Sequence, residues 1–479
     1  MSSKTTLIQK RKWRMYLKKK MGRNTTQTMM NHLQKKKTLK LKETFLSKNG
    51  KITWSSAAYD QHGRYAEQNV IKMTPGPTRY AVSHAHDIIS TFYLFITPAI
   101  EKIILEMTNL EGFRKYGDSW KKMDEIDLGL LILAGVYRSQ GEAAASLWDG
   151  ESGRPIFRAT MPLKLFHTYS RLLRFDDCES RPARRMTDKL AAVREVWDKW
   201  VERLPYLYNP GSDVTVDEQL VPFRVYAQQA SKIWDQVMGG LRCQIKLCLA
   251  NASLYWEADQ WMPREEPGDQ LLKRKITMVG TVRKNKPELP PALLVSKERE
   301  VFSSKFTFTP TTTLVSYLPK KNKNVVLLST LHTDSDISDR EDRKPIIILD
   351  YNCNKGGVDN LYKVIGTYSC RRMTARWPLV IFHNIIDVSS YNAFVIWREI
   401  NPTWMSRKQN KRRVFLEQLG KALVTPLIER RKHVPRTEAS AAVVKAFQSA
   451  GAPDQPEDPA TTATSPARAT EEASSGGDA

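Results

Sequence analysis

The stretch DVTVDEQLVPF (213–223) alternates apolar and polar residues with a period of two, the pattern of a β-strand with one buried face. Further short runs of this kind follow along the chain, at 301–309, 312–318, 324–331 and 345–351. The segment 355–397 then predicts two helices, of which the second is unusually apolar. Strands combined with long helices indicate a mixed α/β fold.

The chain before this strand has helical patterning instead. Its apolar clusters lie in 85–107, 124–138, 162–175 and 188–204. Pro98 interrupts the first cluster, and the second begins with acidic residues and ends at Arg138, as the helix dipole favours. Buried helices of an α-rich domain explain all four segments.

Positive charge is the first indication of function. The 479 residues include 75 Lys and Arg against 51 Asp and Glu, which gives a net charge of +24. Residues 1–50 hold 15 Lys and Arg and a single acid, whereas 438–479 hold two cations and seven acids. Nucleic acid is the usual partner of so basic a protein.

The run KRKWRMYLKKK (10–20) concentrates this charge and interleaves it with aromatic residues. We interpret residues 1–50 as a flexible arm for nuclear import and for phosphate contacts. A solvated tail or a mitochondrial transit peptide are the alternatives. The predicted DNA-binding cations of the arm are Lys10, Arg11, Lys12, Arg14, Lys18, Lys19 and Lys20.

Membrane insertion, secretion and a disulfide framework are all disfavoured. No run of about 18 uncharged apolar residues occurs, and the basic N-terminus lacks an apolar signal region. The five cysteines are scattered and odd in number, which indicates reduced thiols in a cytosolic or nuclear protein. Cys243 and Cys248 lack a second pair at zinc-site spacing, so no zinc is assigned.

Two carboxylates are candidate metal ligands. Asp217 lies in the strand pattern, and Asp359 follows Gly356 and Gly357 where a helix begins. If the fold brings the two carboxylates together, they could bind Mg²⁺, which prefers oxygen ligands. A helix cap or a surface charge would explain either residue equally well.

Several motifs resemble the piggyBac family of DDE transposases. The most specific are TVDEQLVPFR (215–224), LLKRKITMVGTVRKNKPELPPAL (271–293), and the blocks YNCNKGGVDNLYKV and RWPLVIFHNIIDVSSYNAF within 351–394. KNGKITWSS (48–56), NVIKMTPGPT (69–78) and LLRFDD (172–177) are similar to the N-terminal half of that family.

The resemblance implies an RNase H-like catalytic core. In this family three aspartates hold two Mg²⁺ ions, which activate water or a DNA 3′-hydroxyl for excision and reinsertion of DNA at TTAA. Asp217 matches the first aspartate and Asp359 the third.

The sequence departs from the family at other positions. The second aspartate belongs to a segment like CDNFFTS just before LLKRK, and here only Asp259 and Asp269 lie nearby, without that context. A fourth acid found in many relatives is replaced by Tyr362. The Cys-rich, zinc-binding C-terminus has no counterpart, because no cysteine follows Cys370.

The segment 241–270 reads as an out-of-frame translation. If suitable codons are chosen and the reading frame is shifted by one base from Arg242, the codons of 243–250 translate as DAKSSYAW. The same frame continued through Glu257 gives QMQVYTGK. Both strings are similar to the family's second core strand. Such a segment was never selected to pack as a strand. We therefore expect the sheet to be interrupted there, with 256–270 irregular and strand 213–223 without its hairpin partner.

These observations predict five regions. They are a disordered basic arm (1–50), a helical DNA-binding or dimerisation domain (51–208), an incomplete RNase H-like core (209–400), a basic helical segment (401–436) and a disordered tail (437–479). The chain is predicted to be a nuclear, domesticated transposase that binds double-stranded DNA and is catalytically inactive. The sequence leaves open whether it forms a homodimer. The alternatives are an active Mg²⁺-dependent transposase and a transposon remnant without function.

Overall fold

The computed structural model describes residues 43–59, 74–211, 213–215, 253–257, 277–294 and 298–450. The chain forms two compact units. Of the described residues, the sheet unit comprises 43–59, 213–215, 253–257, 277–294 and 298–356, and the helical unit comprises 74–211 and 357–450. Both units are therefore assembled from segments that are far apart in the sequence.

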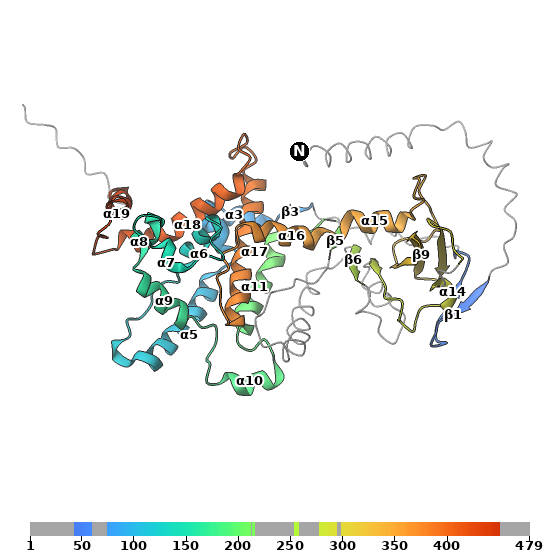
Figure 1. The fold of residues 1–479 in the computed structure, drawn as a ribbon, viewed down its shortest axis with the longest axis horizontal. Coiled ribbons are helices and arrows are strands. Elements are labelled where there is room, and N and C mark those ends of the chain that lie inside the picture. Colours follow the sequence, from blue (N-terminus) through green and yellow to red (C-terminus); the bar gives the residue numbers. More distant parts are fainter. Residues whose placement is uncertain are drawn as a thin grey trace, which may run out of the picture. The chain divides into compact units, whose positions relative to one another are not determined.

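An eight-stranded mixed sheet forms the sheet unit (Figure 1). In spatial order its strands are β1 (Thr44–Leu46), β2 (Thr53–Ser55), β8 (Ser304–Phe308), β9 (Thr313–Lys320), β10 (Lys323–Ser329), β7 (Met278–Thr281), β6 (Ser253–Glu257) and β5 (Asp213–Thr215). Neighbours are antiparallel from β1 to β7, and the last two pairings, β7 with β6 and β6 with β5, are parallel.

Alternation along the strands divides the apolar side chains between the two faces of this sheet. In β7, Met278 packs in a cluster with Trp54 and Leu293, whereas the next residue, Val279, packs in a second cluster with Ile347. Helices α14 (Pro291–Leu294) and α15 (Ile346–Asn354) contribute to the first and second cluster, respectively. The period-two pattern of the sequence therefore builds two apolar layers.

The helical unit contains most of the helices. Those between β2 and β5 in the chain are α3 (Arg79–His84), α4 (Ile88–Tyr93), α5 (Pro98–Tyr116), η3 (Gly117–Ser119), α6 (Leu128–Val136), α7 (Ala144–Leu147), α8 (Pro155–Thr160), α9 (Leu163–Leu172), α10 (Arg181–Thr187) and α11 (Arg194–Leu207). Those after the last strand are α16 (Gly357–Thr367), α17 (Trp377–Ile400), α18 (Lys411–Glu429) and α19 (Glu438–Ala450). A short ladder joins β3 (Gly76–Pro77) to β4 (Tyr208–Asn209).

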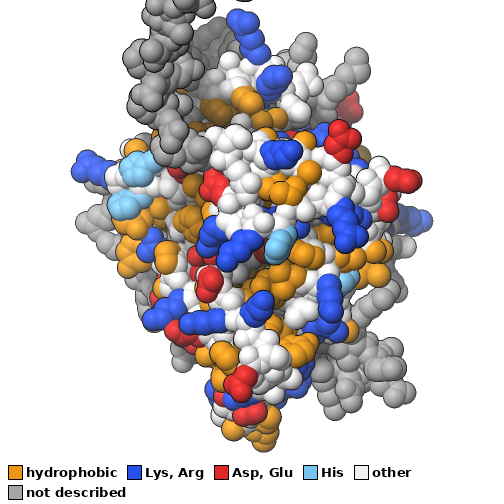
Figure 2. Space-filling view, turned by 90° about the vertical axis from the view of Figure 1, so that its left-hand side faces the viewer, with side chains coloured by type: hydrophobic (Ala, Val, Ile, Leu, Met, Phe, Trp, Pro, Cys, Tyr) orange, Lys and Arg blue, Asp and Glu red, His pale blue; other side chains and the backbone are white. Residues whose placement is uncertain are grey.

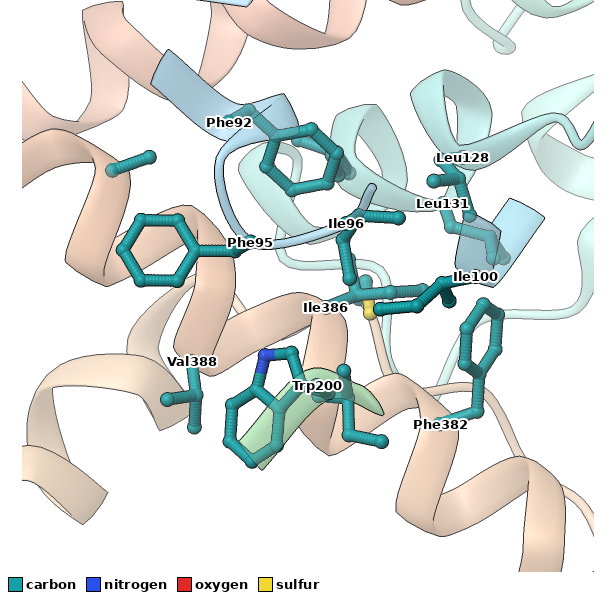
Figure 3. Close-up of a cluster of buried hydrophobic side chains, with 14 of the residues drawn as sticks. Phe92, Phe95, Ile96, Ile100, Leu128, Leu131, Trp200, Phe382, Ile386 and Val388 are labelled. Carbon is teal, nitrogen blue, oxygen red and sulfur yellow. The ribbon is translucent and has the colours of Figure 1, made fainter. Parts of the chain in front are cut away.

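Helix α17 contributes to the main core of this unit. Its Phe382, Ile386 and Val388 belong to one buried cluster with side chains of α4, α5, α6 and α11, part of which is drawn in Figure 3. Trp200 donates a 2.9 Å hydrogen bond to the Ser389 hydroxyl, so its buried indole N–H is satisfied. Among the described residues, α17 is the helix long and apolar enough to cross a membrane, and 72% of its apolar window is buried inside the protein. Burial of this kind is ordinary for a core helix.

The mixed α/β prediction is confirmed, as are the strands predicted in 301–309, 312–318 and 324–331. The strand predicted at 345–351 is wrong, because Pro345 precedes helix α15, whose Ile347 and Ile348 pack in the sheet unit's core. A short apolar run does not by itself distinguish a strand from a buried helix.

Two further expectations differ from the structure. The tail predicted to be disordered from 437 begins with helix α19, whose Val444 is fully buried with apolar residues of α8 and α18. The predicted basic arm extends to residue 50, but β1 (Thr44–Leu46) pairs with β2 in the sheet. Tertiary contacts order these short segments, although their composition resembles that of a flexible chain.

The segment predicted to be irregular contains a strand. β6 lies inside 241–270 and pairs with both β5 and β7, so the expectation is wrong at Trp256 and Glu257. Aromatic residues favour strands whatever the origin of the sequence. Since β5 and β6 are parallel, they do not form a hairpin. Residues 216–252 and 258–276 lie outside the described part.

Candidate functional site

Asp359 lies in the first turn of α16, where its side chain is exposed. A carboxylate at this position complements the positive end of the helix dipole. The predicted helix start after Gly356 is therefore confirmed, and the structural interpretation of Asp359 as a first-turn acid fits its position.

Asp217 lies outside the described residues, but the chain leading to it is placed. β5 ends at Thr215, and the Thr215 hydroxyl donates a 2.6 Å hydrogen bond to the carbonyl oxygen of Asn354, the last residue of α15. Asp217 follows Thr215 by two residues, and Asp359 follows Asn354 by five. One hydrogen bond thus joins the two chain segments that lead to the predicted metal ligands.

Of the predicted metal ligands, only Asp359 belongs to the described residues. No group of three or more His, Cys, Asp and Glu close enough to hold a metal occurs among them. Three residues after Asp359 stands Tyr362, which supplies no carboxylate. Asp259, Asp269 and the cations of the arm lie outside the described part, so their predicted roles stay predictions.

An arginine-rich pocket at the start of α18 was not singled out from the sequence. Two guanidinium groups lie over the ring of Tyr368, that of Arg412 4.8 Å and that of Arg138 5.3 Å from its centroid. Residues Gln409, Asn410 and Arg413 line the same opening, together with Val364, Tyr391 and Phe394. The volume of this outer pocket is about 310 Å³.

An inner recess of about 20 Å³ adjoins the outer pocket, since Tyr391 and Arg412 line both. Ser390 and Asp387 line the recess as well. The Asp387 carboxylate accepts hydrogen bonds from the Ser369 hydroxyl and from the Cys370 N–H, the latter at 2.8 Å. Burial raises the pKa of Asp387 to about 6, although these hydrogen bonds oppose the shift.

The sequence held a signal for this pocket. Residues 401–436 carry ten Lys and Arg against two acids, and three of these cations open α18 without an acidic residue in its first turn. Cations at a helix N-terminus oppose the helix dipole, which makes them unfavourable for the helix alone. What the sequence could not indicate is that Tyr368 and Tyr391 lie beside them.

Comparison with known proteins identifies the class as DNA transposases. A family model described as Transposase IS4 matches residues 89–236 and 269–394, more than half of the chain. The chain belongs to this transposase family and is of the piggyBac type. Its fold matches a cryo-EM structure of the piggyBac transposase synaptic complex with hairpin DNA, with a TM-score of 0.66 and 25% identity over 81% of this chain and 90% of that one.

The family match confirms the resemblance predicted from the motifs. It is interrupted between residues 236 and 269, which nearly coincides with the segment 241–270 that we interpret as out of frame. The gap in the match falls where the sequence lacks the family's CDNFFTS-like segment.

Proposed function

We propose that this chain is a transposase-derived protein that binds DNA without cutting it. The observation that carries the proposal is the interruption of the family match between residues 236 and 269. By resemblance, the second catalytic aspartate belongs in this interval. A two-metal mechanism needs both ions held by a complete set of ligands, and Asp217 with Asp359 supplies only part of it.

DNA binding is supported by charge and by family. The net charge of +24 favours a polyanionic partner, and the solved relative is a complex with hairpin DNA. On the face shown in Figure 2, Lys and Arg side chains are spread among hydrophobic and acidic ones. The concentrated charge of residues 1–50 is the main electrostatic contribution that we propose, and it also motivates a nuclear location.

An excision assay tests the inactive part of the proposal. The full chain is expected to release no product from a TTAA-flanked donor with Mg²⁺, whereas an active piggyBac-type transposase does so on the same donor. Gel-shift binding to duplex DNA by the same preparation shows that the protein is folded and functional. Product that disappears in both Asp217→Asn and Asp359→Asn variants would contradict the proposal.

The strand order favours one alternative, an active transposase with a replaced carboxylate. β6 is the parallel neighbour of β5, with Thr215 and Tyr255 matched in register. Two residues further along each sequence stand Asp217 and Glu257. If excision product forms and a Glu257→Gln variant abolishes it, Glu257 is the second carboxylate and this alternative replaces the first.

A further inference from the structure

We propose that the outer pocket and the inner recess together bind one unstacked nucleotide of DNA. This inference rests on the proposed DNA-binding function and adds a ligand class and a site to it. Its parts are an arginine rim for the phosphate, an aromatic wall for the base and polar groups for the edge of the base.

The arginines of the rim lack acidic partners. Among the described residues, neither Arg412 nor Arg413 forms an ion pair with a carboxylate, whereas Arg430, at the other end of α18, pairs with Glu125 at 2.7 Å. Tyr368 holds Arg412 and Arg138 on one ring, which keeps two like charges close together. A phosphate bound by Arg412 and Arg413 at the rim would offset part of this positive charge.

Structural arginines of the same unit are bound differently. The guanidinium of Arg376 donates to backbone carbonyls, including Ser170 at 3.0 Å, and that of Arg372 donates to Ser139 and Glu142. For Arg412 and Arg413 the described residues provide no such hydrogen bond. Their donors are free for phosphate oxygens, which the planar guanidinium group binds in a bidentate manner.

The aromatic and amide side chains of the outer pocket can bind a nucleotide base. Tyr391 and Phe394 supply aromatic surface, on which bases of any sequence can stack. The Gln409 and Asn410 side chains are amides, which can pair with base edges. The volume of about 310 Å³ lies within the usual range of small-molecule sites, roughly 300–1,000 Å³.

The inner recess contains an unsatisfied polar group. Ser390 is 4% exposed, and among the described residues its hydroxyl oxygen has no hydrogen-bond partner. A recess of about 20 Å³ holds one water-sized group, so a polar atom of a ligand or one water satisfies this hydroxyl. Because Asp387 also lines the recess, a phosphate is excluded there. The base therefore points inward and the phosphate stays at the arginine rim.

The test compares two DNA probes with the full chain. They are a blunt duplex and the same duplex with a short single-stranded overhang, measured by fluorescence anisotropy at one salt concentration. Since stacking of one base contributes about 1–3 kcal/mol, wild type should bind the overhang probe roughly tenfold more tightly. The variants Tyr391→Leu and Arg412→Gln/Arg413→Gln should lose this preference.

Lys408→Gln/Lys411→Gln is the matched control, because it removes the same charge beside the pocket from residues that do not line it. It should weaken binding of both probes equally and keep their ratio. Thermal unfolding shows whether each variant is folded. If Tyr391→Leu does not fold, the Arg412→Gln/Arg413→Gln variant alone tests the site. A wild-type ratio near one, or a ratio that survives both pocket variants, overturns the nucleotide site. Wild type that binds neither probe overturns the proposed function instead.

Discussion

Asp127 has a carboxylate with two roles that oppose each other. One oxygen caps α6 by accepting a 3.0 Å hydrogen bond from the Leu130 N–H. The other oxygen is buried without a hydrogen-bond partner among the described residues. Burial raises the pKa of Asp127 to about 7, and the charge of Glu125 adds to the shift. The cap stabilises the helix, while the buried charge destabilises the fold.

The pH dependence of stability follows from this raised pKa. The contribution of Asp127 is fully present below its unfolded pKa of 3.8 and is lost as the pH rises through about 7. We expect Asp127→Asn, which keeps a capping oxygen without a charge, to unfold at higher temperature than wild type at pH 8. The gain is at most about 4 kcal/mol, from 1.36 kcal/mol per pKa unit, and it shrinks at pH 4.

Asp127→Ala provides the comparison for this measurement. It removes the capping oxygen as well as the charge, so relative to Asp127→Asn it should lose about 1 kcal/mol at every pH. The same stability difference between wild type and Asp127→Asn at pH 4 and pH 8 would show that the carboxylate does not titrate as described.

At the scale of elements, α6 and α18 approach each other through glycines. Every residue of α6 is buried, and the carbonyl of its Gly129 lies beside Gly420 of α18. A Cβ atom added to Gly420 would lie 2.7 Å from Cγ of Leu133 and 3.3 Å from that carbonyl oxygen. The helices are therefore too close for any side chain at Gly420 unless one of them moves.

We expect Gly420→Ala to destabilise the protein by about 1–3 kcal/mol, the usual cost of overpacking a core. Chemical denaturation measures this change. Gly366→Ala in α16 is the matched control, because nothing lies within 4 Å of its added Cβ atom. This control should be neutral or stabilising by up to about 1 kcal/mol, as alanine is the better helix former. Equal effects at both positions would contradict the close packing.

At the scale of the whole molecule, the basic arm should dominate non-specific DNA affinity. Residues 1–42 contain fourteen Lys and Arg and no acid, and they end before β1, so their deletion leaves the sheet intact. The truncated chain is expected to bind duplex DNA more weakly and with a shallower dependence on salt, because fewer counterions are released. Binding titrations at several salt concentrations measure both quantities.

Deletion of 451–479 is the control for this truncation. That segment carries six acids and one cation, so its removal makes the chain more basic and should not reduce affinity. An unchanged affinity and salt slope after removal of 1–42 would assign DNA binding to the folded units instead.

The sequence by itself determined the family, the α/β class and most of the elements. The motifs around Asp217 and Asp359, the alternation of β9 and the helix start after Gly356 are local patterns of the sequence. These features depend on neighbouring residues, which a sequence displays directly.

Only the tertiary structure decided the features that depend on distant residues. The sequence of helix α15 predicts a strand, but its isoleucines pack in the core of the sheet unit as part of a helix. Strand β6 forms between β5 and β7 although its sequence departs from the family. The pocket likewise joins Tyr368, Tyr391 and Arg412, which come from three separate segments. Burial and pairing are properties of the folded chain, because the free energy of a contact depends on which segments meet.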